Sequence, residues 1–268
     1  CNDKENIQEL INNTSRKVTG NMFGFFTDKI NKVRVGIIGL GNRGTVLLEM
    51  FQYLVEKQHA EIVALSDIQE KKTKKATDIL SQWQNNSISI YNKSEDDWKN
   101  LVKRDDIDLL IIATPWNLHT PMAVLGMEHG KHIACEVPIA YSLEDCWLLT
   151  ETAEKNRKHC IMLENCNYNE EELWVLNMIQ EGVFGDITHT EGGYLHDLRA
   201  LLLHDNYYQG QWRLKHHENR DGNLYTTHGL GPISYYLQIG RGDNFAHLTS
   251  MSSRELNLSL AAKKINHK

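Results

Sequence analysis

Residues 32–44 read KVRVGIIGLGNRG, and this stretch decides the fold. The β-branched run at residues 32–39 predicts a buried strand. The pattern G-x-G-x-x-G follows at residues 39–44, and apolar residues at helical spacing follow over residues 45–57. A glycine turn between a strand and a helix lets the backbone approach a pyrophosphate at the helix N-terminus. The stretch therefore predicts a dinucleotide-binding unit.

Each glycine of this pattern has its own physical role. Gly39 permits the tight turn, Gly41 lets the backbone approach the phosphates, and Gly44 permits close packing of the helix. Asp67 closes the second predicted strand, 23 residues after Gly44. That is near the offset of about 20 residues at which a carboxylate binds a ribose 2′-hydroxyl. Because a carboxylate there repels a 2′-phosphate, the sequence predicts NAD rather than NADP.

Strands alternate with helices as far as residue 164. Further strands are predicted over residues 61–67, 108–114, 132–136 and 160–163, and helices over residues 45–57, 71–83, 96–103, 121–129 and 143–158. This alternation is typical of βαβ units in a parallel sheet. We therefore expect an α/β protein whose residues 32–164 form a Rossmann domain with a doubly wound parallel sheet. Residues 1–31 read as a leader that docks on it.

The alternation stops after residue 164. Residues 170–180 predict a helix, and the alternating residues 186–194 predict a strand. The polar stretch that continues to His216-His217 reads as a solvated loop. We expect residues 165–268 to form an α+β domain that binds substrate. Because few strands are left for its sheet, we expect this domain to be truncated.

Charge and composition exclude several classes. The chain holds 29 basic and 35 acidic residues, for a net charge of −6, and has no basic block. We therefore expect no nucleic-acid partner. No apolar run approaches the roughly 20 residues that span a bilayer. The histidines at positions 196, 204, 216 and 217 match no standard ligand spacing, so we expect no metal site.

Cys1 has two readings of equal weight. A cysteine ahead of a polar tether is what a processed bacterial lipoprotein looks like. That reading predicts a lipid anchor at Cys1 and an exported protein, periplasmic or at the cell surface. The other reading is an arbitrary chain boundary, which leaves the protein cytoplasmic.

Two further segments lie at predicted strand ends. Trp116-Asn117-Leu118-His119 follows the strand at residues 108–114, and Glu136-Val137-Pro138 ends the strand at residues 132–136. Parallel sheets bind their ligands at the carboxyl ends of the strands. We therefore expect Trp116 and His119 to touch the cofactor. The alternative for His119 is a helix-capping or core histidine.

The strand ending in Glu-x-Pro resembles the Gfo/Idh/MocA superfamily of sugar oxidoreductases. Its motif is usually Glu-Lys-Pro, and the lysine serves the proton transfer that accompanies hydride transfer. Here Val137 stands in that position and carries no proton. This difference argues against a standard sugar dehydrogenase.

Longer segments resemble one branch, the NAD-dependent glycoside hydrolase family 109, which is named for α-N-acetylgalactosaminidase activity. The matching segments are GLGNRG at residues 39–44, ATPWNLH at 113–119, CEVP at 135–138, EGGYLHDLR at 191–199, WRL at 212–214 and GNLYTTHGLGP at 222–232. Thr226 departs from the proline usual in the last segment. Family members also run well past Lys268, and a tyrosine from that region helps bind substrate.

The resemblance implies a set of site residues. The implied NAD contacts, beside the glycine turn, are Asn42, Arg43, Asp67, Trp116, Asn117, Leu118, His119, Glu136, Val137 and Asn165. The implied sugar pocket is lined by Tyr194, Arg213, Tyr225, Thr226, Thr227 and His228. Tyr225 and His228 are the catalytic candidates. Their alternative role is a helix N-terminus that packs against the sheet.

The resemblance also implies the chemistry. Hydride leaves the sugar C3 for NAD⁺, the resulting ketone acidifies the C2 proton, and the aglycone leaves by elimination. Water then adds and the hydride returns, so NAD is recycled. The implied substrate is a small glycoside or a glycan terminus with an α-linked N-acetylgalactosamine. The resemblance also implies a homo-oligomer. His228 suits proton transfer near neutral pH, and Arg213 suits stabilisation of an enolate.

Two alternatives stay open. One is a sugar oxidoreductase with net turnover of NAD. The other is a truncated homologue that binds NAD and sugar without catalysis.

Overall fold

A computed structural model describes residues 20, 22–220 and 222–265. The chain divides into two compact units, Cys1–Met162 and Leu163–Lys268. Cys1, with the lipid anchor predicted there, lies outside the described residues. Among the described residues, no helix is both long and apolar enough to cross a membrane.

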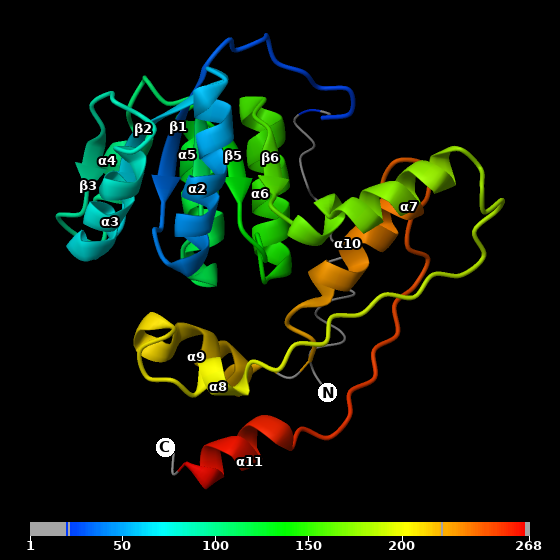
Figure 1. The fold of residues 1–268 in the computed structure, drawn as a ribbon. Helices are drawn as coiled ribbons and strands as arrows, with labels where there is room; N and C mark the ends of the chain where they lie inside the picture. The colour runs from blue at the N-terminus through cyan, green and yellow to red at the C-terminus, as the bar shows by residue number, and fades with distance from the viewer. Residues whose placement is uncertain (1–19, 21, 221, 266–268) are drawn as a thin grey trace. The chain divides into compact units, whose positions relative to one another are not determined.

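The first unit is built on one six-stranded parallel sheet in the order β3-β2-β1-β4-β5-β6 (Figure 1). The chain winds outward from β1 to β3, then returns to the centre and winds the other way from β4 to β6. This is the doubly wound order predicted for a Rossmann domain, so the α/β class is confirmed. The strands are β1 Val33–Ile38, β2 Ala60–Ser66, β3 Ser89–Tyr91, β4 Leu109–Ile112, β5 His132–Cys135 and β6 Cys160–Met162.

The connections of the first unit are helical, and the predicted helices are present with ends shifted by a few residues. They are α2 Asn42–Glu56, α3 Glu70–Leu80, α4 Trp98–Val102, α5 His119–Glu128 and α6 Leu143–Asn156, with the short 3₁₀ helix η1 Trp116–Leu118. Sequence reasoning missed β3. That strand reads Ser-Ile-Tyr and is only half-buried, so it forms no apolar run in the sequence.

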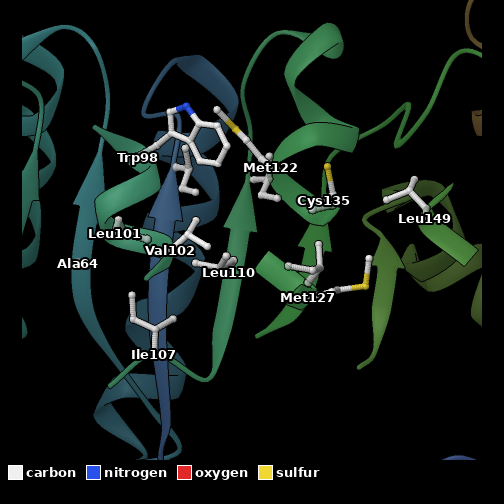
Figure 2. Packing of buried hydrophobic residues seen from close by; sticks show 14 of the residues in the cluster. Ala64, Trp98, Leu101, Val102, Ile107, Leu110, Met122, Met127, Cys135 and Leu149 are labelled. Carbon is white, nitrogen blue, oxygen red and sulfur yellow. The ribbon is translucent and has the colours of Figure 1, made fainter. Parts of the chain in front are cut away.

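The core of the first unit fills both faces of the central strand β1. Gly36 faces α4, because a Cβ there would lie 2.9 Å from Leu101 Cδ2. Successive residues of a strand point to opposite faces, so Val35 and Ile37, both fully buried, face the other way. Figure 2 shows side chains of α4 and α5 gathered around Leu110 of β4. This burial explains why the strands read as continuous apolar runs.

The described part of the leader contacts the rest of the first unit around Arg157 and His159. Phe25 lies 4.7 Å from the ring of His159, and the Arg157 guanidinium lies over it at 4.4 Å. Phe23 and Phe26 are 86% and 81% exposed. The Phe25 ring and Met22, whose sulfur accepts from Arg157 at 3.9 Å, therefore make docking contacts of the leader.

The second unit is helical in its described residues (Figure 1). Its elements are η2 Asn165–Tyr168, α7 Glu170–Gln180, α8 Arg199–Leu202, η3 Gln209–Gln211, α9 Trp212–Asn219, α10 Thr226–Tyr236 and α11 Asn257–Lys264. The helix predicted over residues 170–180 is confirmed. The loop predicted through His216-His217 is wrong, because both histidines lie on α9.

The strand predicted over Asp186–Tyr194 is also wrong. The segment has no strand partner, and no strand is found among the described residues of the second unit, so the α+β expectation fails there. The segment lies instead against α10: a Cβ on Gly192 would be 2.8 Å from Ile233 Cδ1 and 2.9 Å from the Gly229 oxygen. A segment packed along a helix can alternate in polarity as a strand does.

An ion pair links the two central strands of the sheet. Arg34 on β1 donates from Nε and from a terminal nitrogen to the two oxygens of Asp108, at 2.9 and 2.7 Å, and its backbone N–H donates at 2.9 Å. Asp108 directly precedes β4. The hydrogen bonds from Arg34 lower the pKa of Asp108 below its ordinary value. The pair thus holds β1 and β4 in register.

We expect Asp108→Asn to lower the free energy of unfolding by about 1–2 kcal/mol at pH 7, measured by urea denaturation. A carboxyl with a lowered folded pKa stabilises above its unfolded pKa of about 3.9, and this is lost as the pH falls through the folded pKa. The difference between wild type and variant should therefore shrink below about pH 4. Asp78→Asn, which removes the exposed Lys74–Asp78 pair, is the control and should change little. Equal effects of the two variants would contradict the prediction.

Candidate functional site

The glycine turn lies between the end of β1 and the start of α2. Gly39 has φ +89°, which side chains disfavour, and a Cβ there would lie 2.6 Å from the Ala113 carbonyl oxygen. A Cβ on Gly44 would lie 1.9 Å from the Gly39 oxygen. A Cβ on Gly41 would meet only Lys72 Nζ, at 3.9 Å. The first and last glycines are therefore required by packing, whereas Gly41 leaves open space.

The N-terminus of α2 has the properties of an anion site. Its N-cap residue Gly41 makes no side-chain cap hydrogen bond, and its first turn holds no acidic residue. The first N–H groups of a helix have no partner within the helix, and the dipole favours negative charge there. With the open space at Gly41, these residues fit a pyrophosphate. Asn42 is the exposed first residue of this helix.

Asp67 follows β2 and turns its carboxylate to the same loop. Its Oδ2 accepts from the Leu40 N–H at 2.8 Å, and its Oδ1 accepts from the Gln69 N–H at 2.8 Å. Lys72 Nζ lies 4.0 Å from Oδ2. The carboxylate is thus held in one orientation beside the glycine turn, and its remaining lone pairs can accept from a ribose.

An ion pair joins two residues that the sequence analysis placed separately at the cofactor. Arg43, in the first turn of α2, donates from Nε to Glu136 Oε1 at 2.6 Å. Glu136 follows β5, and its Oε2 accepts from the Val137 N–H at 3.3 Å. In the sheet β4 separates β1 from β5. The pair therefore links the two sides of the carboxyl edge across the end of β4.

The segment after β4 is mostly internal. Trp116 is 4% exposed and His119 is 1% exposed, while Asn117 is exposed and Leu118 is half-buried. The His119 ring nitrogens lie 2.8 Å from the Thr114 oxygen and 2.7 Å from the Pro138 oxygen. Burial lowers the pKa of His119, opposed by these carbonyls and by Glu136. The ring therefore joins the loops after β4 and β5, which agrees with the alternative that His119 is a core histidine. Its contact with the cofactor stays a prediction.

The catalytic candidates lie together in the second unit. Tyr225 is the N-cap residue of α10, and Thr226, Thr227 and His228 form its first turn. The rings of Tyr225 and His228 stack at 5.2 Å with an interplanar angle of 20°. Tyr194 lies against both, with its ring centroid 4.6 Å from that of His228. The structure therefore brings three predicted pocket residues into one cluster.

Arg213, on α9, adds a positive charge to this cluster. Its guanidinium lies 4.9 Å from the centre of the Tyr225 ring and donates to the Tyr208 hydroxyl. Burial raises the pKa of Tyr194, and the charge of Arg213 opposes that shift. Burial and then Arg213 also lower the pKa of His217. Arg213 is thus placed to stabilise negative charge beside Tyr225.

The sequence analysis missed Glu164, the partner of His228. This carboxylate is 1% exposed, and its Oε1 accepts from His228 Nδ1 at 2.6 Å and from the Cys166 N–H at 3.1 Å. The available signal was an acid directly after a predicted strand. Asn165, the next residue, is exposed and donates to Cys166 Sγ at 3.7 Å.

Glu164, Cys166 and His228 offer three ligand atoms that lie within 4.8 Å of one another. Two ligands about 2.0–2.1 Å from a tetrahedral zinc ion lie about 3.3 Å apart. The separation of 2.6 Å between Glu164 Oε1 and His228 Nδ1 is that of a hydrogen bond. This geometry favours a shared proton over an ion. The absence of a metal site, expected from the sequence, stays a prediction.

The parallel sheet order, the glycine turn and Asp67 together define a dinucleotide-binding protein with a Rossmann domain. Residues 33–164 match the family model described as "Oxidoreductase family, NAD-binding Rossmann fold". Residues 168–267 match the model described as "Glycosyl hydrolase 109, C-terminal domain". The chain belongs to glycosyl hydrolase family 109, within the Gfo/Idh/MocA oxidoreductases, and NAD is the cofactor of its Rossmann domain.

Curated relatives agree with this assignment. A glycosyl hydrolase family 109 protein 1 of Shewanella sp. (strain ANA-3) is 44% identical over 248 residues, which cover 92% of this chain and 53% of the relative. An alpha-N-acetylgalactosaminidase of Shewanella oneidensis is 43% identical over 243 residues, which cover 91% and 52%. The chain thus spans about half the length of the curated relatives it matches.

A solved structure shows the same fold. The apo scyllo-inositol dehydrogenase of Lactobacillus casei is 20% identical, with a TM-score of 0.50, over 60% of this chain and 45% of that one. At this identity the likeness extends to the fold alone.

We expect Gly44→Ala to lower the free energy of unfolding by about 1–3 kcal/mol, because α2 must move away from the Gly39 carbonyl. Gly41→Ala is the matched control, since its methyl group meets open space and its φ of −70° suits alanine. It should leave stability nearly unchanged. Urea denaturation of both variants measures the difference, and equal losses would contradict the packing argument.

We expect Asp67→Asn to weaken NADH binding about tenfold, because a charge-assisted hydrogen bond to the ribose is lost. NADPH binding should weaken less or improve, because the repulsion of a 2′-phosphate falls. Fluorescence titration with both dinucleotides gives the ratio of their dissociation constants. If both affinities fell by the same factor, the carboxylate would only hold the loop.

Proposed function

We propose that this protein hydrolyses α-linked N-acetylgalactosamine from a small glycoside or glycan terminus. The proposal rests on the relationship to family 109 and on the name of the Shewanella oneidensis relative. The observation in this chain that carries it is the cluster of Tyr194, Tyr225 and His228 on α10 and beside it. Such a cluster combines a proton-transfer group with flat apolar rings, which suits a sugar.

The residues of the second unit supply acid–base chemistry and charge. Glu164, as a carboxylate, only accepts, so His228 Nδ1 carries the proton and Nε2 is the basic nitrogen. Among the described residues Nε2 makes no hydrogen bond. His228 Nε2 would remove or return a proton on the sugar. The Tyr225 hydroxyl is the second acid–base candidate, and the Arg213 guanidinium would oppose charge on an enolate oxygen.

The first unit supplies the cofactor. When bound, NAD⁺ provides a reversible hydride acceptor for the sugar C3, and the glycine turn, α2 and Asp67 would hold it. Val137, buried where oxidoreductases of this superfamily carry lysine, has no proton to transfer. This favours hydrolysis with a recycled cofactor over net sugar oxidation. Lipidation of Cys1, export and self-association stay predictions.

The test is release of p-nitrophenol from p-nitrophenyl α-N-acetylgalactosaminide, with and without added NAD⁺, while absorbance at 340 nm is recorded. Release that leaves no lasting NADH supports the proposal. NADH that accumulates in proportion to the sugar would indicate an oxidoreductase. No release by folded, NAD-loaded protein from any glycoside would overturn the hydrolase and leave a binding homologue.

We expect His228→Ala to lower kcat about 10²- to 10⁴-fold in this assay, because the proton-transfer group is removed. The binding of NAD should not change, since His228 is not among the residues implied to contact NAD. His189→Ala is the control: it removes an exposed histidine of the same unit and should retain full activity. Full activity of His228→Ala would remove this histidine from the mechanism.

A further inference from the structure

Glu164 is an unusual residue to find inside the second unit. It is 1% exposed, and its Oε2 is buried with no hydrogen-bond partner. Burial of a carboxylate costs free energy unless the charge is paired and hydrogen-bonded. Here both donors, His228 Nδ1 and the Cys166 N–H, meet the same oxygen, Oε1. Oε1 therefore accepts two hydrogen bonds, whereas Oε2 accepts none. A carboxylate with both oxygens hydrogen-bonded would stabilise the fold more than this arrangement does.

The backbone around this carboxylate is built for a close approach. Gly231 lies three residues after His228 on α10, which places both on one face of the helix. A Cβ on Gly231 would lie 2.8 Å from Glu164 Cγ and 2.5 Å from Asn167 Oδ1. The missing side chain at Gly231 therefore lets α10 sit directly on η2. That approach sets the distance at which His228 meets Glu164.

A second glycine contact lies beside His228 on α10. A Cβ on Gly229 would lie 3.1 Å from the Gly192 carbonyl carbon and 3.2 Å from its oxygen. This contact brings the segment with Tyr194 onto the His228 ring. The imidazole is therefore held between an aromatic ring and a buried carboxylate. Its orientation is over-determined, as expected of a group that must be placed accurately.

We propose that Glu164 is a positioning residue for His228. The carboxylate fixes the tautomer with the proton on Nδ1, holds the ring in place, and stabilises the imidazolium that forms when Nε2 takes a proton. A carboxylate behind a catalytic histidine acts in this way in the serine-protease triad. The proposal rests on the proposed role of His228 in glycoside hydrolysis, but the tautomer can be measured without any activity.

Two substitutions separate orientation from charge. Glu164→Leu removes both the hydrogen-bond acceptor and the negative charge. The Nδ1–H tautomer of His228 should then no longer predominate, and kcat should fall about 10²- to 10⁴-fold. Glu164→Gln keeps an acceptor, because the Cys166 N–H holds the amide oxygen at the position of Oε1. It should retain the tautomer and lose a smaller factor in kcat, since only the charge that stabilises imidazolium is lost. KM should change by less than about threefold in both variants.

The measurements use the full chain. The ¹⁵N chemical shifts of the His228 imidazole, with His228→Ala for assignment, report the tautomer, and p-nitrophenol release reports kcat and KM. Glu170→Gln, in the exposed first turn of α7, is the matched control and should behave as wild type. A purely structural role would lower the unfolding temperature of the variants without changing the tautomer or kcat per folded molecule.

Each outcome decides the proposal. A wild-type tautomer and wild-type kcat in Glu164→Leu would overturn it. If that variant does not fold, wild-type kcat in Glu164→Gln would overturn it equally. If the wild-type chain releases no p-nitrophenol, the proposed function fails. The tautomer in Glu164→Leu, or in Gly231→Ala if the leucine variant does not fold, then still decides the positioning role, and an unchanged tautomer would overturn it.

Discussion

The contact between the Gly39 carbonyl and the backbone at Gly44 is the constraint on which the first unit depends. Its closeness leaves no room for a side chain at Gly44, so α2 starts directly at the carboxyl edge of the sheet. Asp67, which follows the neighbouring strand β2, accepts a hydrogen bond from the Leu40 N–H. Arg43 donates to Glu136, which follows β5 on the far side of β4. The cofactor residues from three strand ends are thus arranged around one turn whose shape is set by backbone packing.

The second unit uses the same device around His228. Gly229 and Gly231 let α10 be approached closely from two sides, once by the extended segment that carries Tyr194 and once by η2 with Glu164. Because the backbones are so close, the side chains of Glu164 and Tyr194 both contact the His228 imidazole. The unit therefore assembles its cluster without a sheet in the described residues, although the sequence had predicted a strand there.

Local patterns predicted those features that depend on neighbouring residues. The strands of the first unit, their helices and the glycine turn follow from periodicity and spacing over a few residues, and the structure confirms them. The short strand β3, the helix α9 and the extended course of residues 186–194 could not be predicted. Two of these features depend on a partner elsewhere in the chain: β3 pairs with β2, and residues 186–194 pack against α10. The Arg43–Glu136 pair joins residues 93 positions apart, and no local pattern indicates it.

By itself, then, the sequence determined the class of fold, the cofactor and the residue types of the candidate site. Those follow from short motifs, whose geometry is set by the covalent backbone and by nearest neighbours. Only the tertiary structure decided that His119 joins two loops with its ring nitrogens, and that Glu164 is the partner of His228. The physical reason is that a hydrogen bond selects its partner by distance and direction in space. When two residues are far apart in the sequence, their positions along the chain do not show whether the fold brings them within that distance.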